Sequence, residues 1–277
     1  MKGFKFKILL IISGMLISFG SCNELFKKSG KGKSSAEKQS DIKIVKEYFA
    51  NHQLKSEISV RGKMREGITK NYNKSGNLIS EVNYSNNKLD GLSTNYYASG
   101  KVHSTIMYKN GVKNGETVWY YESGKVFRVT PFTDGEINGI QKFYFEDGKP
   151  MAEVPYKNGQ PGIGTKEYSK EGNLITKYPT IKFDEINHIL VEDKLILKVR
   201  LSNNSYRVEF FKGNLADGKY LSDNLTEIPD NRGVCTFEYY VPSGYVKNEK
   251  LNFVVKYKTD YDLPYIMQKS YNLVLQH

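Results

Sequence analysis

The middle of this chain repeats itself every 24 residues, which leaves few folds open to it. A tyrosine and a glycine recur at this separation. They are Tyr72, Tyr96, Tyr120, Tyr144 and Tyr168, and Gly76, Gly100, Gly124, Gly148 and Gly172. Tyr48 extends the series backwards, so the sequence predicts about six units within residues 44–180. A period of this length is typical of stacked arrays in which each unit buries its surface against its neighbours.

Each unit is predicted to form a β-hairpin. Apolar residues alternate along the second half of a unit, as in Val102, Ile106 and Tyr108, which is the period of a strand. Ser-Gly or Asp-Gly pairs separate the two halves, and Asn-Gly or Asp-Gly pairs such as Asn110 and Gly111 separate the units. These residues tolerate the positive φ that hairpin turns require. The predicted fold class is all-β, beginning with an elongated antiparallel hairpin array.

Residues 181–277 follow a different pattern and are expected to form a separate domain. Leu195, Leu197 and Val199 lie at alternate positions, and similar alternation recurs up to the C-terminus between Gly and Pro breaks. We expect six or seven strands in a small β-sandwich of immunoglobulin-like size. Cys235 shares its strand parity with Phe237, which predicts a buried, unreactive thiol.

Residues 1–21 have the features of an export signal. Lysines precede the apolar stretch Ile8–Gly20, which is too short to span a bilayer. The following residues, Ile17–Cys22, resemble the lipobox of bacterial lipoproteins, with Phe19 where Leu is usual. The resemblance implies cleavage before Cys22 and a diacylglyceryl thioether on its sulfur. The alternative is an ordinary secreted protein with a free Cys22.

Residues 22–43 are rich in Lys, Ser and Gly, which predicts a flexible tether. The whole chain has 41 basic and 30 acidic residues and a formal charge of +11. Only six of the basic residues are arginine, the side chain that best binds phosphates and guanine. We therefore expect no nucleic-acid partner. The lysines of the tether suit either contact with anionic lipid headgroups or simple solubility.

The repeat itself carries a family resemblance. The segments 96–101, 108–115 and 120–125, with their Tyr, Gly, Lys and Asn-Gly pattern, are similar to the MORN variant repeat of bacterial exported proteins. The resemblance implies a hairpin array that binds partners, with no catalysis by the repeats. Proteins with this repeat are often catalogued as antitoxins, and MORN repeats are associated with proteins that lie near membranes. Pro150 and the segment 161–164 depart from the pattern, which predicts that the array loosens toward its end.

The sequence offers little sign of catalysis. None of the four histidines has a second His or Cys at a metal-ligand spacing. Gly162 and Gly164 lack the third glycine of a dinucleotide loop. The adjacent acids Asp184 and Glu185 would point to opposite faces of a strand. We expect no catalytic residue, no metal and no cofactor.

One feature points to binding. The residue after the repeated tyrosine is aromatic in four units, namely Phe49, Tyr97, Tyr121 and Phe145. Strand alternation places these rings on the face opposite the repeated tyrosines, beside Trp119. They would form either an aromatic stripe for a polysaccharide, a peptide or a partner sheet, or rings that pack across strands. Asn73 and Ser169 interrupt the series, which favours packing.

Three functions follow from these observations. The first is a non-enzymatic binding or assembly scaffold in the cell envelope, anchored through its lipid on the periplasmic or cell-surface side. The second is an antitoxin or immunity-type protein, although an exported protein cannot neutralise a toxin in the cytoplasm. The third is an enzyme that uses residues 181–277.

Overall fold

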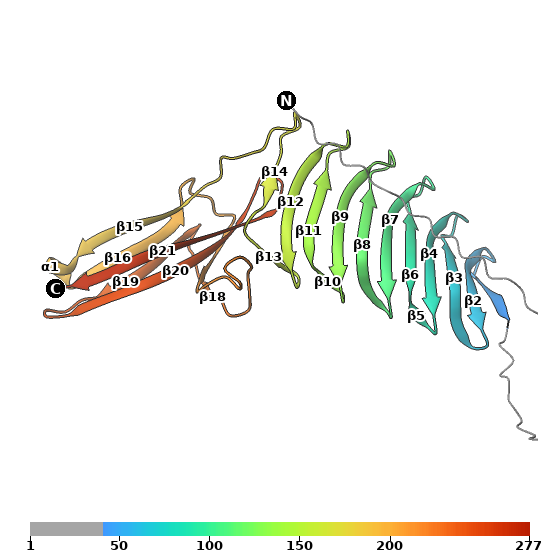
Figure 1. Ribbon diagram of the computed structural model, residues 1–277, viewed down its shortest axis with the longest axis horizontal. Helices are drawn as coiled ribbons and strands as arrows, with labels where there is room; N and C mark the ends of the chain where they lie inside the picture. Colours follow the sequence, from blue (N-terminus) through green and yellow to red (C-terminus); the bar gives the residue numbers. More distant parts are fainter. Residues whose placement is uncertain (1–40) are drawn as a thin grey trace, which may run out of the picture. The chain divides into compact units, whose positions relative to one another are not determined.

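A computed structural model describes residues 41–277 of the chain (Figure 1). The predicted signal peptide, the predicted lipidation site Cys22 and most of the predicted tether lie outside these residues. The first strand, β1 (Ile42–Tyr48), begins before the boundary expected at residue 44. No helix within the described residues is long and apolar enough to cross a membrane.

Fourteen strands form one antiparallel sheet. After β1 they are β2 (Leu54–Arg61), β3 (Met64–Tyr72), β4 (Leu78–Ser85), β5 (Lys88–Leu89), β6 (Gly91–Tyr96), β7 (Val102–Lys109), β8 (Val112–Tyr120), β9 (Val126–Thr133), β10 (Glu136–Ile137), β11 (Gly139–Tyr144), β12 (Pro150–Lys157), β13 (Gln160–Pro161) and β14 (Lys166–Glu167). Figure 1 shows β2 to β12 side by side in chain order. The predicted all-β hairpin array is therefore confirmed.

The connections between units are tight turns of the expected kind. Asn110 and Gly111 have φ angles of 51° and 94°, and they join β7 directly to β8. Two successive positive φ angles define the type I′ turn, whose twist matches that of the paired strands. Asn86 and Asn87 form the equivalent turn without glycine, with φ angles of 49° and 66°.

A β-bulge recurs within the units, on the second strand, opposite the step that leads into the repeated tyrosine. The register shifts between Asn71 and Tyr72, Asn95 and Tyr96, Trp119 and Tyr120, and Phe143 and Tyr144. The extra residue at each shift lies on the second strand, at Ile79, His103, Phe127 and Met151. A bulge bends its strand and changes where the side chains there point. Because the bulge keeps its place in the repeat, these units present their side chains in the same way.

The array loses regularity after β12, as the sequence predicts. Pro150 begins β12, a place where a strand tolerates proline. The last unit keeps its turn, in which the Ser169 amide donates to the Asn173 carbonyl at 2.8 Å. Its strands are reduced to β14 and to a single bridge between Tyr168 and Leu174.

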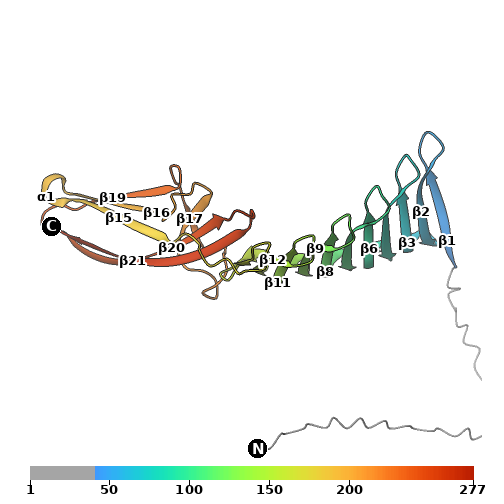
Figure 2. The same cartoon turned by 90° about the horizontal axis from the view of Figure 1, so that it is seen from above.

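The C-terminal residues form two sheets around one core. The elements are β15 (Ile181–His188), α1 (Ile189–Glu192), β16 (Lys194–Leu201), β17 (Val208–Lys212), β18 (Thr226–Ile228), β19 (Val234–Tyr240), β20 (Val246–Lys258) and β21 (Pro264–Gln276). One sheet has the order β15-β16-β19 and the other β18-β17-β20-β21. Figure 2 shows β15, β16 and β19 on one side of this domain and β20 and β21 on the other.

The sandwich core confirms the alternation seen in the sequence. Leu195, Leu197 and Val199 of β16 are buried and pack in one cluster with Phe253 of the opposite sheet. Cys235 is fully buried in the same cluster, and burial raises the pKa of its thiol to about 12. A thiol with such a pKa is not a nucleophile at neutral pH.

Candidate functional site on one face of the repeat array

One row of side chains crosses the whole array on a single face. Residues opposite each other on paired strands share a face of the sheet. The row consists of Glu47, Ser56, Asn71, Ser80, Asn95, Ser104, Trp119, Arg128, Phe143, Ala152 and Glu167, each in register with the next. We call it the central row, and its side of the sheet the Trp119 face.

The chemistry of the central row changes along the array. Its first part consists of polar pairs: Ser56 Oγ donates to Glu47 at 3.0 Å, Asn71 Nδ2 to Ser80 Oγ at 2.9 Å, and Asn95 Nδ2 to Ser104 Oγ at 3.0 Å. From Trp119 onward the row is aromatic and apolar, apart from Arg128 and the terminal Glu167. Identical backbone positions therefore carry different surfaces.

Arg128 is the one cation at the centre of this aromatic part. Its guanidinium lies over the indole of Trp119, with Cζ 3.8 Å from the ring centroid. The same carbon lies 5.9 Å from the rings of Phe127 and Phe143. Within residues 41–277 its Nε is buried without a hydrogen-bond partner, and its guanidinium pairs with no carboxylate.

Burial lowers the pKa of Arg128, because desolvation disfavours the charged form. An arginine nevertheless stays protonated in proteins. The ring contacts stabilise its charge only in part. The result is a partly desolvated cation that is suited to receive an anionic group.

Tyr97 and Tyr121 occupy equivalent positions and link neighbouring units. Each hydroxyl donates to the backbone carbonyl that lies 23 residues ahead, from Tyr97 to Tyr120 at 2.5 Å and from Tyr121 to Tyr144 at 2.8 Å. The Tyr121 ring meets Phe127 edge-on at 5.2 Å, next to the central row. The hydroxyls therefore connect successive hairpins, while the rings lie on the Trp119 face.

The two phenylalanines of the predicted stripe lie in different surroundings. Phe145 meets the ring of Tyr261, from the C-terminal domain, at 6.1 Å. Phe49 is half-buried in the turn after β1, where its amide donates to the Gln53 carbonyl at 2.8 Å. The structure thus groups Trp119 and Tyr121 and places Tyr97 one unit away. Tyr261 covers part of Phe145, and Phe49 lies at the β1 end of the array.

The repeated tyrosines lie on the opposite face, as the sequence predicts. Tyr72 donates to Glu57 at 3.0 Å and Tyr96 to Glu81 at 2.8 Å. Lys46 and Lys70 pair with the same two glutamates at 3.2 and 3.3 Å. Ile68, Leu92 and Ile140 are exposed on this face.

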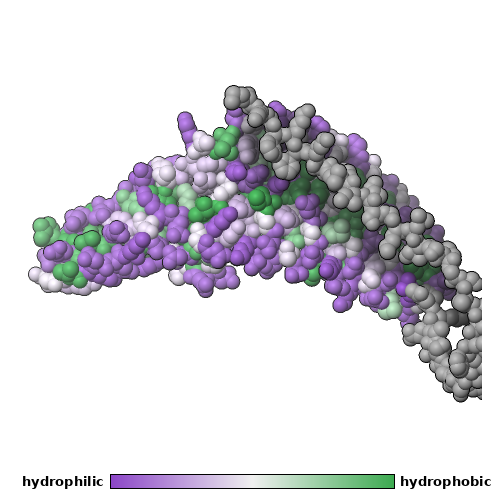
Figure 3. Space-filling model, in the orientation of Figure 1, coloured by the Kyte–Doolittle hydropathy of each residue, from purple (hydrophilic) through white to green (hydrophobic). Residues whose placement is uncertain are grey.

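In the view of Figure 3, which shows the whole molecule from one side, apolar patches are scattered over a mostly hydrophilic surface.

The tip of the β20–β21 hairpin packs on the end of the Trp119 face. Leu263 at this tip belongs to a buried cluster with Phe143, Ala152 and Val154 of the array. Tyr261 packs against the cluster. These contacts tie the last full hairpin to the C-terminal domain and set one limit of the accessible face.

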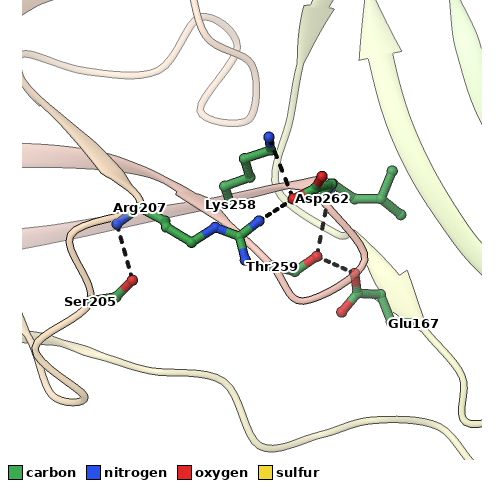
Figure 4. A network of polar contacts seen from close by, with 7 residues as sticks. Glu167, Ser205, Arg207, Lys258, Thr259 and Asp262 are labelled. Carbon is green, nitrogen blue, oxygen red and sulfur yellow. Dashed lines mark hydrogen bonds and ion pairs between the residues drawn. The ribbon is translucent and has the colours of Figure 1, made fainter.

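Glu167 ends the central row at this contact. Its carboxylate accepts hydrogen bonds from the Thr259 hydroxyl and, at 3.1 Å, from the Tyr178 hydroxyl. Burial raises the pKa of Glu167, while the two hydrogen bonds act in the opposite direction. Figure 4 shows Thr259 directed at this carboxylate.

A cavity of about 660 Å³ lies beside this network. Its charged walls are already paired: Arg207 and Lys258 with Asp262, and Lys256 with Glu209. Figure 4 shows Arg207 and Lys258 converging on Asp262. Each of these cations has a carboxylate partner, although Arg207 and Lys258 share Asp262, whereas Arg128 has none within the described residues.

Sequence reasoning did not identify Arg128 or the contact made by Leu263. A signal for Arg128 was present, because its repeat position is serine in three earlier units, at Ser56, Ser80 and Ser104. Within residues 41–277 no three His, Cys, Asp or Glu side chains are grouped to hold a metal ion. Cys22, the remaining predicted site residue, lies outside the described part of the chain.

Four consecutive hairpins match a known family. Residues 65–86, 89–110, 113–134 and 137–158 match the MORN repeat variant, and each segment covers one long strand pair, from β3–β4 to β11–β12. No curated protein matches this chain. Repeats of this kind suggest a binding or scaffolding role. Four of the hairpins in this array are thus similar to MORN variant repeats.

Proposed function

We propose that this chain is a non-enzymatic binding and assembly scaffold of the cell envelope, held at a membrane by a lipid on Cys22. The regular array supports a scaffold role, because it repeats one backbone geometry over a large surface. The basic start of the chain, the apolar stretch Ile8–Gly20 and the lipobox-like end at Cys22 support the anchor.

The observation that carries the binding role is Arg128 on Trp119. A guanidinium without a carboxylate partner binds carboxylates and phosphates through two parallel hydrogen bonds. The rings of Trp119 and Tyr121 suit the apolar faces of sugars or side chains. The partner is therefore a protein or polysaccharide that carries acidic groups.

The binding role can be tested by fluorescence, because Trp119 is the only tryptophan in the chain. The full chain is titrated with polygalacturonate, with a polyglutamate peptide and with neutral dextran. We expect the two anionic probes to change the Trp119 emission and dextran to leave it unchanged. Since salt screens charge, the change should weaken as the salt concentration rises.

Two arginine variants decide whether Arg128 is responsible. Arg128→Met should abolish the response to the anionic probes. Arg65→Met is the matched control, because Arg65 also stacks on a ring, that of Tyr84 at 5.2 Å, and its loss changes the net charge equally. A wild-type chain that responds to neither anionic probe, or two variants with the same response, would contradict the binding role.

The anchor is tested separately. Mass spectrometry of the mature N-terminus should show acyl groups on residue 22, and Cys22→Ser should move the protein from the membrane fraction to the soluble fraction. A mature protein without acyl groups would contradict the anchor and leave the binding test unaffected.

A further inference from the structure

The array has an open edge at β1. Its described neighbour is β2 alone, and all seven residues of β1 are exposed. Ile44 and Val45 have exposed fractions of 63% and 47%. An edge strand presents unpaired backbone N–H and C=O groups to any further strand that can align with it.

Proteins usually protect such an edge with lysine and other charged side chains, with proline or with a mid-strand bulge. Strand β1 carries Lys43 and Lys46, so it accepts only a strand that places acidic or apolar side chains opposite these lysines. Strand β1 contains no proline, and its register shift lies only at its end, between Glu47 and Tyr48. Regular pairing therefore extends from Ile42 to Glu47. The edge is long enough to take another strand.

The sequence of β1 is complementary to itself in the antiparallel direction. With Val45 opposite its own copy, Lys43 faces Glu47 of the second copy and Ile42 faces Tyr48, while Ile44 faces Lys46 without a like-charge clash. A twofold axis makes each of these pairs occur twice. Opposite charges and apolar side chains that face each other across strands stabilise a sheet.

The two neighbouring registers are worse. A register centred on Ile44 places Asp41 opposite Glu47, and one centred on Lys46 places that lysine opposite its own copy. Like charges directly opposite each other destabilise paired strands. Among registers that leave the Trp119 faces of the two copies on the same side of the joined sheet, the one centred on Val45 is therefore preferred over its two neighbours.

We propose that β1 is the interface through which two copies of this chain pair edge to edge, centred on Val45. The existing contacts of Glu47 are compatible with this, because Ser56 at 3.0 Å and Lys55 at 3.7 Å both contact its Oε2 and its side chain is half-exposed. Its Oε1 has no partner within the described residues and can pair across the edge. Lys43 forms no ion pair within the described residues. Each Lys43 therefore gains a partner in the dimer.

Charge reversal tests the pairing in solution. In the full chain carrying Cys22→Ser, which prevents acylation, light scattering should show a mass that rises toward two chains with concentration. Lys43→Glu should weaken the dimer about ten-fold, because it faces Glu47 with a like charge twice. Adding Glu47→Lys should restore pairing. Lys63→Glu, in the exposed turn between β2 and β3, is the control and should have no effect.

Crosslinking tests the register directly and does not depend on the charge variants. Val45→Cys should form a disulfide between two chains, because the axis places the two thiols opposite each other. Position 43 is also exposed, but in this register it lies four residues along the strand from position 43 of the second copy, so Lys43→Cys should not crosslink. A chain that stays monomeric, as it would if its own N-terminal residues covered β1, overturns the proposal. Equal crosslinking at the two positions also overturns it.

Discussion

The hydroxyl of Thr259 donates a hydrogen bond to the carboxylate of Glu167, although the two residues are 92 positions apart in the chain. Glu167 lies on β14, the last short strand of the array sheet, and Thr259 follows β20 at the hairpin tip of the C-terminal domain. This bond, together with the packing of Leu263 on Phe143, links the two regions. It also places a buried carboxylate at the link.

The stability of this link should depend on pH through Glu167. Burial raises its pKa above the ordinary 4.5, so the folded chain holds the proton more tightly than the unfolded chain. The corresponding stability is present at low pH and is lost as pH rises from 4.5 through the folded pKa. Glu167→Gln removes the titration and keeps an oxygen acceptor. In urea denaturation it should gain stability relative to wild type as pH increases, and parallel pH curves would contradict this.

Thr117 and Thr130 face each other across β8 and β9 and are both buried. The Thr117 hydroxyl has no partner within the described residues, whereas Thr130 accepts a hydrogen bond from Gln141 Nε2 at 2.8 Å. Thr117→Val should raise the free energy of unfolding by about 1 kcal/mol, and Thr130→Val should lower it by about 1–3 kcal/mol. Urea unfolding followed by Trp119 fluorescence measures both. Changes of the same sign would contradict the assignment.

The Tyr121 hydroxyl should stabilise the contact between successive units. Tyr121→Phe keeps the ring against Phe127 and removes only the bond to the Tyr144 carbonyl. We expect a loss of about 0.5–1.5 kcal/mol in the free energy of unfolding. Tyr97→Phe should lose a similar amount. Tyr206→Phe, at a side chain that is 77% exposed, is the control, and an equal loss there would contradict the prediction.

Gly139 and Gly124 should tolerate alanine differently. Both have positive φ, 121° and 87°. A Cβ on Gly139 would lie 3.0 Å from Pro131 Cγ, whereas a Cβ on Gly124 meets nothing within 4 Å. Gly124→Ala should cost about 1 kcal/mol from backbone strain alone, and Gly139→Ala about 2–3 kcal/mol. Thermal denaturation that ranks the two variants in the reverse order would contradict this.

Much of the array could be predicted because its determinants are local and repeated. The Asn110-Gly111 turn needs only two residues that tolerate positive φ, and the alternation of Val102, Ile106 and Tyr108 needs only a strand. Twenty-four residues later the same reasoning applies again. An error in placing one strand therefore does not shift the strands predicted after it. The order of the strands in the sheet follows from the short connections between them.

The candidate site was less accessible to sequence reasoning. Leu263 reaches Phe143 across 120 positions, and no local pattern encodes such a contact. The aromatic residues after the repeated tyrosines could be placed on the correct face. The carbonyl partners of Tyr97 and Tyr121 could not, because each ring packs on a bulge residue of the paired strand, His103 and Phe127, and the alternation in the sequence does not reveal that bulge. Arg128 was visible as a departure from serine, but its stacking on Trp119 required the register.

The strands of the array lie across the direction in which the sheet extends from β1 to β12, and this has a mechanical consequence. Hydrogen bonds of a sheet lie perpendicular to its strands, so tension between β1 and the C-terminal domain acts along those bonds. Such a load opens one strand pair at a time instead of shearing many bonds together. Pulled from its first strand, the array should yield in successive hairpins, with the sandwich still intact while the earliest units have unravelled.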